Sequence, residues 1–162
     1  SDLDVLVSFV DDWRQALDKD KLVGAVMIDL SKAFDSVNHS ILCAKLQSYG
    51  VRGAELQWFK GYLSGRRQRV SMGNVTSDWS VIKRGVPQGS ILGPLLFTIH
   101  VNDLPKAVVG SQTKQYADDT TIYHMSDSCT DLEKGLSKDL ASVDEWLQRN
   151  GLQMDVEKTQ IM

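Results

Sequence analysis

Two adjacent aspartates, Asp118 and Asp119, lie in the middle of the stretch 115–123, between runs of aromatic and β-branched residues. Such runs favour strands, so the stretch predicts a tight β-hairpin with the aspartates at or beside its turn. Adjacent strand residues point to opposite faces, but a turn can bring both carboxylates toward one cavity. Two carboxylates this close repel each other unless a cation lies between them. Taken alone, the pair favours a simpler interpretation, a solvated turn, because aspartate is common in turns.

A third carboxylate follows an apolar stretch near the start of the chain. Residues 22–28 read LVGAVMI, which is typical of a strand buried on both faces, and Asp29 follows directly. A carboxylate at the end of a buried strand is costly to ionise unless it is paired or metal-bound. Helical patterning resumes beyond Phe34 and continues to Gly50, which we expect to end the helix. Asp29 therefore lies between a strand and a helix, where ligand sites concentrate, while Asp35 is interpreted as a capping or turn residue.

Length and charge limit the possible classes of protein. The chain has 162 residues, enough for one domain with a real core, and its 42% hydrophobic content is ordinary for a globular protein. The net charge of −3 does not by itself indicate a nucleic-acid partner. Basic residues nevertheless cluster at Arg66, Arg67 and Arg69, with Lys83 and Arg84 further on. The arginines could contact phosphates, although a solvated charged face is an equally good interpretation.

Cysteines, histidines and apolar runs add little chemistry. Cys43 and Cys129 have no metal-type spacing and suggest a reducing compartment. The three histidines are scattered and are interpreted as structural. We expect no signal peptide, and the most apolar run, residues 91–101, is too short to span a bilayer. Both ends of the chain look cut from something longer.

The remaining elements follow from periodicity and turn residues. We expect helices over 3–17, 54–63 and 130–149, two short strands near 68–72 and 79–83 joined by a turn at 73–74, and a last strand pair within 152–162. Thr130 and Glu133 resemble a capping box at the start of the long helix. Residues 85–90, GVPQGS, predict a rigid loop before an apolar helix, and the amide of Gln88 could read a base or sugar. A buried structural turn is the alternative interpretation of this loop.

The carboxylates can be combined into one site. If the strand ending at Asp29 lies beside the hairpin that carries Asp118 and Asp119, three carboxylates from neighbouring strands could bind two divalent cations. Two such ions about 4 Å apart clamp the attacking and leaving oxygens in phosphoryl transfer. That chemistry needs positioning and charge neutralisation and no serine or cysteine nucleophile.

The ordered motifs resemble the palm domain of reverse transcriptases, above all those of non-LTR (LINE-type) retrotransposons. They are residues 29–35 (DLSKAFD), 85–90 (GVPQGS), 116–119 (YADD), 151–152 (GL) and 158–159 (KT). The likeness covers nearly the whole chain. It implies an α+β fold, a polymerase palm with a small antiparallel sheet and helices packed on one face, and a single palm segment over 1–162. The helix over 130–149 would cover the back of the sheet.

The resemblance also implies roles for individual residues. Asp29 and Asp118 match the metal ligands, Asp119 matches the supporting carboxylate, and the carbonyl of Leu30 would face the metal. Lys158 matches a lysine near the triphosphate, a candidate general acid. Leu30 also belongs to the nucleotide-binding residues, and three further positions match that set: Phe34, an aromatic gate that would collide with a 2′-hydroxyl, and Gln88 with Gly89, in the loop that contacts nucleotide and template.

The implied activity is that of an RNA-directed DNA polymerase. It would use two Mg²⁺ ions, with Mn²⁺ as a possible substitute, and act on an RNA template, a DNA primer and deoxynucleoside triphosphates. The location would be intracellular, in the nucleus, the cytoplasm or both, with no membrane partner. The family's fingers and thumb lie upstream and downstream of the part that this chain matches, so the segment could be inactive alone.

Three alternatives remain open. A catalytically inactive, retrotransposon-derived remnant could still bind nucleic acid or protein. A two-metal nuclease would explain the acids but gives no role to the Pro87–Gln88–Gly89 loop or to Phe34. An RNA-directed RNA polymerase palm is opposed by the aromatic gate.

Overall fold

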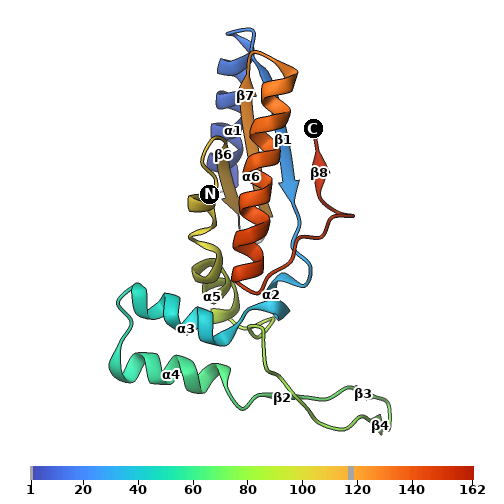
Figure 1. Ribbon diagram of the computed structural model, residues 1–162. Helices are drawn as coiled ribbons and strands as arrows, with labels where there is room; N and C mark the ends of the chain where they lie inside the picture. Colours follow the sequence, from blue (N-terminus) through green and yellow to red (C-terminus); the bar gives the residue numbers. More distant parts are fainter. Residues whose placement is uncertain (1, 117–118) are drawn as a thin grey trace. The chain divides into compact units, whose positions relative to one another are not determined.

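The computed structural model describes residues 2–116 and 119–162. They divide into two compact units (Figure 1). The sheet unit comprises the chain up to Ala33 together with Val101–Met162, and the helical unit comprises Phe34–His100. The prediction of one palm segment over 1–162 stays a prediction.

A four-stranded antiparallel sheet forms the centre of the sheet unit. Its strands are β1 (Leu22–Ile28), β6 (Gln112–Tyr116), β7 (Asp119–Ser126) and β8 (Gln160–Ile161), in the order β6-β7-β1-β8. The long central pair β1 and β7 runs in register from Leu22 opposite Ser126 to Ile28 opposite Thr120. The strand predicted over 22–28 and its place beside the hairpin are therefore confirmed.

Helices cover both faces of this sheet. Side chains alternate between faces along β1. A Cβ on Gly24 would lie 2.9 Å from Leu136, so this face packs against α6 (Cys129–Arg149). The opposite face carries Tyr123, whose ring packs on Phe9 of α1 (Asp2–Leu17). Helix α6 is thus the helix expected over the back of the sheet, and α1 adds a layer on the other side (Figure 1). The α+β class and the small antiparallel sheet are confirmed.

Buried apolar side chains and a few buried polar groups hold the sheet unit together. Val26, Ile122, Val143 and Leu147 are almost completely buried between sheet and α6. On the α1 face, the Tyr123 hydroxyl donates to Asp12 Oδ2 at 2.6 Å. Burial, together with this hydrogen bond and the charge of Asp12, raises the pKa of Tyr123, so the phenol stays protonated.

Asp139 is a buried carboxylate that fixes a loop to α6. It is 1% exposed and accepts hydrogen bonds from the main-chain amides of Val109 at 3.0 Å and Gly110 at 3.2 Å. Burial alone would raise its pKa, but these bonds and those from Ser111 outweigh it and hold the pKa of Asp139 below its usual value. The loop it holds follows the short 3₁₀ helix η1 (Leu104–Ala107) and leads into β6.

The helical unit contains four helices and two short ladders. The helices are α2 (Ala33–Ser36), α3 (His39–Ser48), α4 (Gly53–Leu63) and α5 (Leu92–Val101), and α3 packs on α4. The chain predicted as one helix beyond Phe34 is therefore broken into α2 and α3. The break occurs at Asn38, whose side chain caps α3 by accepting from the amides of Ser40 and Ile41.

Between α4 and the 85–90 loop, the chain forms a two-stranded arm over residues 66–82 (Figure 1). Near its base β2 (Arg67–Gln68) pairs with β5 (Ser80–Val81), and at its tip β3 (Ser71–Met72) pairs with β4 (Val75–Thr76). Gly73 has a φ of 59°, a left-handed conformation that suits the predicted turn at 73–74. The expected hairpin exists, but its ladder is interrupted at Arg69–Val70 and Ser77–Trp79.

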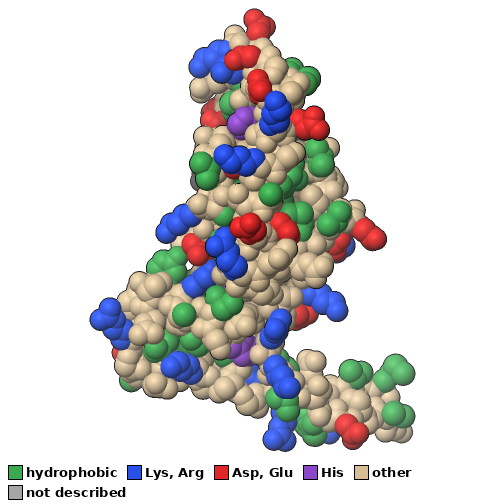
Figure 2. Space-filling view, in the orientation of Figure 1, with side chains coloured by type: hydrophobic (Ala, Val, Ile, Leu, Met, Phe, Trp, Pro, Cys, Tyr) green, Lys and Arg blue, Asp and Glu red, His purple; other side chains and the backbone are tan. Residues whose placement is uncertain are grey.

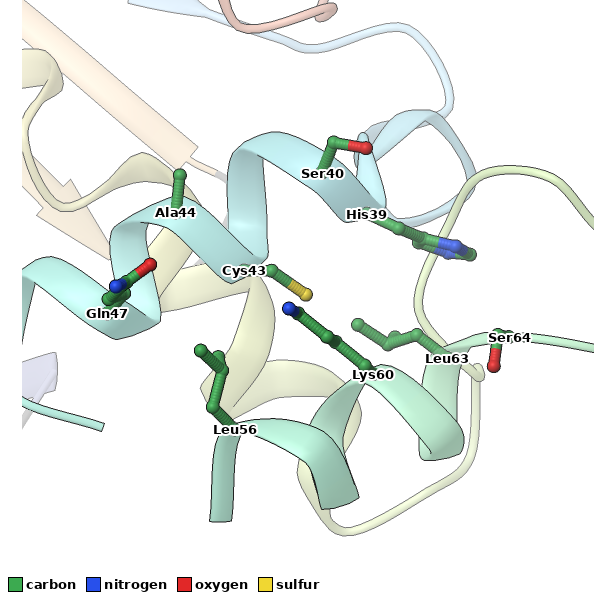
Figure 3. Close-up of a pocket in the computed structure, with 9 residues that line it drawn as sticks. All are labelled: His39, Ser40, Cys43, Ala44, Gln47, Leu56, Lys60, Leu63 and Ser64. Atoms are coloured by element: carbon green, nitrogen blue, oxygen red, sulfur yellow. The ribbon is translucent and has the colours of Figure 1, made fainter. Parts of the chain in front are cut away.

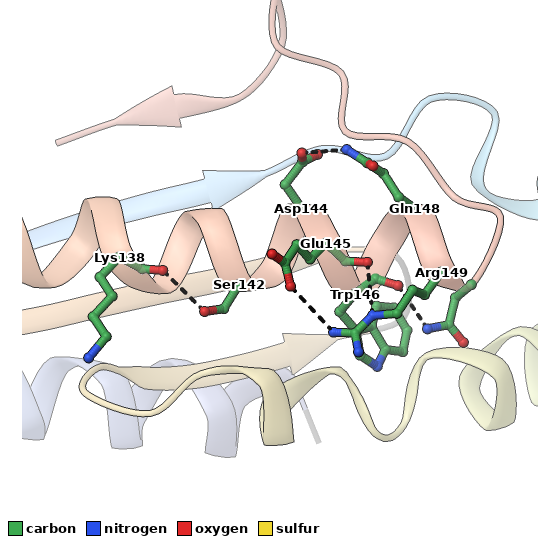
Figure 4. A network of polar contacts seen from close by, with 8 residues as sticks. Lys138, Ser142, Asp144, Glu145, Trp146, Gln148 and Arg149 are labelled. Atoms are coloured by element: carbon green, nitrogen blue, oxygen red, sulfur yellow. Dashed lines mark hydrogen bonds and ion pairs between the residues drawn. The ribbon is translucent and has the colours of Figure 1, made fainter.

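The start of α6 differs from the expected capping box. Ser128 is the cap, because its hydroxyl oxygen accepts from the amide of Asp131 at 3.2 Å and its hydroxyl donates to the Asp131 carboxylate. The prediction that centred the box on Thr130 and Glu133 is wrong by two residues. Further along α6, exposed pairs join side chains one turn apart, including Gln148 with Asp144 and Arg149 with Glu145 (Figure 4).

Among the described residues, no helix combines the length and apolar character that a membrane crossing requires.

Candidate active site

Two of the predicted carboxylates meet at one end of the sheet. Ile28 is the last residue of β1 and pairs with Thr120 of β7. Asp29 follows Ile28 and Asp119 precedes Thr120, so these two aspartates occupy the next position along adjacent strands, which lie about 5 Å apart. Asp119 is exposed and the Asp29 side chain is 41% exposed, so both carboxylates are accessible to a ligand.

Lys158 lies at the same end of the sheet. Its Nζ is 3.9 Å from Asp29 Oδ1 and 3.4 Å from Asp155 Oδ2. The main chain explains this approach, since the amide of Asp155 donates to the Asp29 carbonyl at 2.9 Å. Leu30, expected to present its carbonyl to a metal, is buried and bridges to Met154. The segment 153–158 is thus held by main-chain contacts beside residues 29–31.

Asp118 lies outside the described residues, between β6 and β7. Within residues 2–116 and 119–162, no three His, Cys, Asp or Glu side chains form a group able to hold a metal ion. Asp29 and Asp119 are hard oxygen donors, the type that Mg²⁺ prefers, and Mg²⁺ commonly uses only one or two protein carboxylates. The donor chemistry of Asp29 and Asp119 therefore fits a divalent cation.

Of the predicted nucleotide-binding residues, Leu30 belongs to the sheet unit, and Phe34, Gln88 and Gly89 belong to the helical unit. Phe34 packs on Phe97 of α5, with ring centroids 4.7 Å apart and nearly parallel planes. The loop 85–90 is hydrogen-bonded to residues 34–37. The amide of Gly85 donates to the Val37 carbonyl and the amide of Val86 to the Phe34 carbonyl, both at 2.8 Å. This packing holds the Phe34 ring against α5.

Gly85 is required where the loop meets this segment. Its φ is +90°, and a Cβ there would lie 2.8 Å from Asp35 Cα. The carbonyl of Gly85 accepts a hydrogen bond from His39 Nε2 at 2.8 Å, which confirms a structural role for this histidine.

Asp35 has a partner that sequence reasoning missed. Gln88 Nε2 donates to Asp35 Oδ1 at 3.0 Å, and both side chains are exposed. Asp35, interpreted from sequence as a capping or turn residue, lies in the first turn of α2 and also accepts this hydrogen bond from the predicted nucleotide-reading amide. Only its place one residue after Phe34 could have pointed to this. Gly89, next to Gln88, is exposed, with a φ of +77°.

A separate pocket of about 440 Å³ lies between α3 and α4 (Figure 3). The labelled side chains include Cys43 and Lys60, whose ammonium end lies near the sulfur. Burial raises the pKa of the Cys43 thiol, and the nearby Lys60 only partly offsets this. The thiol is therefore a poor nucleophile at neutral pH, and none of the predicted site residues lines the pocket.

Comparisons with known proteins agree on one family. The family profile described as "Reverse transcriptase (RNA-dependent DNA polymerase)" matches residues 4–162. A probable RNA-directed DNA polymerase from transposon BS of Drosophila melanogaster is 35% identical over 90% of this chain and 17% of its own length. The polymerase from mobile element jockey of Drosophila funebris is 32% identical over 82% of this chain and 15% of its own. The chain thus spans about a sixth of the length of these curated relatives.

Solved structures show the same fold at low identity. Telomerase from Candida tropicalis, solved with a TWJ fragment of telomeric RNA, superposes with a TM-score of 0.72. It is 14% identical, and the match covers 97% of this chain and 29% of the telomerase chain. A Candida albicans telomerase gives a TM-score of 0.70 over the whole of this chain and 31% of its own.

Proposed function

Because this chain belongs to the reverse transcriptase (RNA-dependent DNA polymerase) family, we propose that it is the catalytic palm of an RNA-directed DNA polymerase. The reaction would be transfer of a deoxynucleotide to a primer 3′-hydroxyl, with release of pyrophosphate. One observation carries the proposal: Asp29 and Asp119 occupy the next position beyond paired residues on adjacent strands. The template would be RNA and the primer DNA, and fingers and thumb would come from a longer parent chain.

The carboxylates would hold two divalent cations. Asp29, Asp119 and the neighbouring Asp118 would be the ligands, with the Leu30 carbonyl as a further oxygen donor. Bound Mg²⁺, or Mn²⁺ in its place, would neutralise the charge on the transferring phosphate and lower the pKa of the attacking hydroxyl. The protein would contribute rigid placement, because the β1–β7 ladder fixes the spacing of Asp29 and Asp119.

Lys158 is proposed as the general acid. Its ammonium lies 3.9 Å from Asp29, near enough to the carboxylates to meet the triphosphate of a bound nucleotide. The proton on Nζ would pass to the pyrophosphate oxygen as its bond to the α-phosphorus breaks. The side chain is 66% exposed, so it is free to turn toward a substrate.

Phe34, Gln88 and Gly89 are proposed to bind the incoming nucleotide. The Phe34 ring, fixed against Phe97, would exclude a ribose 2′-hydroxyl by collision. Gln88 would present the side-chain amide that Asp35 orients, and Gly89 would let the main chain approach the nucleotide closely.

Primer extension on an RNA template tests the catalytic assignment. The assay uses the full-length parent protein, with Asp119→Asn as the test variant and the exposed Glu133→Gln as a charge-matched control. Asp119→Asn should lower the rate at least about a hundredfold, as loss of a preorganised electrostatic group does. Glu133→Gln should leave it unchanged. A folded parent without activity would support the inactive-remnant alternative instead.

Metal binding gives a second readout that does not require catalysis. The thermal midpoint of the 162-residue chain should rise on titration with Mn²⁺, because a ligand that binds only the folded state stabilises it. Asp29→Asn and Asp119→Asn should each reduce the rise, and Glu133→Gln should not. Equal shifts in all variants would contradict a metal site at these carboxylates.

A further inference from the structure

The arm and the end of α4 concentrate positive charge. Residues 60–84 contain six of the eighteen Lys and Arg residues but only one of the twenty-one Asp and Glu residues, Asp78. The chain as a whole carries −3. Figure 2 shows blue side chains along the base of the arm, while its tip carries green hydrophobic side chains among tan ones. A local excess of this kind in an acidic chain points to a binding surface for an anionic partner.

The register of the arm gathers part of this charge on one face. Arg67 pairs with Val81, so the two side chains share a face. One step of two residues toward the tip, Arg69 lies over Trp79, with its guanidinium carbon 4.5 Å from the ring centroid. Arg67 with Val81 and Arg69 with Trp79 are thus two successive pairs along the arm, and we call these four residues the arm face.

A second aromatic group adjoins the base of the arm. Trp58 and Tyr62 stack on α4, with centroids 5.5 Å apart and planes 11° from parallel. Arg66, at the first residue of the arm, lies 5.7 Å from the Tyr62 ring centroid. Trp58 is 56% exposed and Trp79 is 58% exposed, so large ring surfaces at both places remain open to a ligand.

The cations of this region have no acidic partners among the described residues. Within residues 2–116 and 119–162, no ion pair links a carboxylate to Arg66, Arg67, Arg69, Lys83 or Arg84. An arginine stacked on a ring still presents its N–H edge, which matches a phosphate in a bidentate manner. Cations and exposed ring faces together are what single-stranded nucleic acids bind, because every base can stack and every linkage carries a charge.

We propose that the arm face, together with Trp58 and Tyr62, binds single-stranded nucleic acid. Arg67 and Arg69 contact backbone phosphates, and bases stack on Trp79 and Trp58. The inference deepens the proposed function and rests on it for the identity of the strand, an RNA template. A protein partner is less favoured, because the face joins arginines to aromatic rings and carries no acid.

Fluorescence anisotropy with the 162-residue chain tests this surface. The probe is a labelled oligouridine RNA of about 12 nucleotides, within the range of sites built on this chemistry. The buffer contains EDTA and no nucleoside triphosphate, so the result does not depend on polymerase activity. The same sequence as single-stranded DNA and a blunt duplex of equal length serve as comparison probes.

Two variants separate stacking from charge. Trp79→Ala should weaken binding of the RNA about 5- to 150-fold, the effect of losing one stacked base. The double variant Arg67→Gln/Arg69→Gln should make the salt dependence of log K shallower by about 1.4, since each phosphate contact on a single strand contributes about 0.7. The control Lys134→Gln/Lys138→Gln removes the same charge from exposed positions on α6 and should change neither quantity.

Each outcome bears on a different part of the inference. Equal affinity for the duplex, or no effect of Trp79→Ala, would overturn base stacking. Unchanged binding by both arm variants, with circular dichroism showing an intact fold, would overturn the assignment of the arm face as the binding surface.

Arm-dependent self-association in sedimentation, without RNA binding, would overturn nucleic acid as the ligand and indicate a second copy of the chain instead. Tighter binding of RNA than of DNA would support the template as the ligand, and the reverse would overturn it. A chain that binds but does not polymerise would contradict only the proposed function.

Discussion

Residues of the same type contribute very differently to the stability of this fold. Asp139 and Asp144 are both carboxylates on α6. Asp139 is buried and accepts main-chain amides from the loop before β6, whereas Asp144 is exposed and accepts only from Gln148 on its own helix (Figure 4). Hydrogen bonds to a buried charge stabilise a fold more than exposed side-chain pairs do.

Asp139→Asn should therefore lower the free energy of unfolding at pH 7 by about 1–3 kcal/mol, because an amide cannot accept from the loop as a carboxylate does. Asp144→Asn should change it by less than about 0.5 kcal/mol. Urea unfolding measures both.

The same comparison has a pH dependence. The folded-state pKa of Asp139 lies below the unfolded value of about 3.9. Its contribution is thus fully present above pH 3.9 and is lost as the pH falls through the folded pKa. The difference between the wild-type chain and Asp139→Asn should shrink as the pH falls below 3.9. A difference that stayed constant would show that the carboxylate is not the stabilising group.

Gly85 gives a second residue-scale prediction. Gly85→Ala should destabilise the chain by more than about 1 kcal/mol, because the new Cβ would meet the Asp35 main chain and the left-handed φ would be strained. Gly73→Ala is the matched control: its φ is also positive, but nothing lies within 4 Å of a Cβ there. Thermal unfolding of both variants separates collision from backbone strain, and equal losses would rule out the collision.

At the scale of elements, the local sequence was enough to predict most of the helices, strands and turns. The apolar run 22–28, the helical periodicities of α1, α4 and α6, and the turn at Gly73 were each predictable, because each is set by residues within one element. The predictions were wrong at helix boundaries, where the position of the end depends on a residue outside the periodic stretch. Asn38 breaks the helix after Phe34, and Ser128 replaces Thr130 as the cap, since capping depends on where the chain enters the helix.

Ser128→Ala should lower stability by about 0.5–2 kcal/mol through loss of the cap on α6. Thr130→Ala should have little effect, because that side chain is already inside the helix. Chemical denaturation of the two variants decides between the observed cap and the one expected from sequence. A larger loss in Thr130→Ala would favour the latter.

At the scale of the molecule, the order of the motifs predicted the family, and the expected adjacency of two strands predicted part of the candidate active site. The resemblance to non-LTR retrotransposon enzymes is confirmed by the family match and by the relatives. The adjacency of β1 and β7 is also confirmed. The link from Gln88 to Asp35 was not predictable, because it joins residues 53 positions apart. The roles of Asp29, Asp118, Asp119 and Lys158 stay predictions until they are measured.

The order of the chain through the two units has a kinetic consequence. The helical unit, Phe34–His100, is inserted into the sequence of the sheet unit. Strand β1 can therefore pair only with β7 and β8, which lie about a hundred residues or more further along the chain. Contacts this distant in sequence form slowly, whereas α3 and α4 pack on each other locally. In pulse-labelled hydrogen exchange, we expect amides of α3 and α4 to gain protection before those of β1, and simultaneous protection would contradict this. On a ribosome, β1 would emerge long before its partners, and its apolar side chains would be a target for chaperones during that interval.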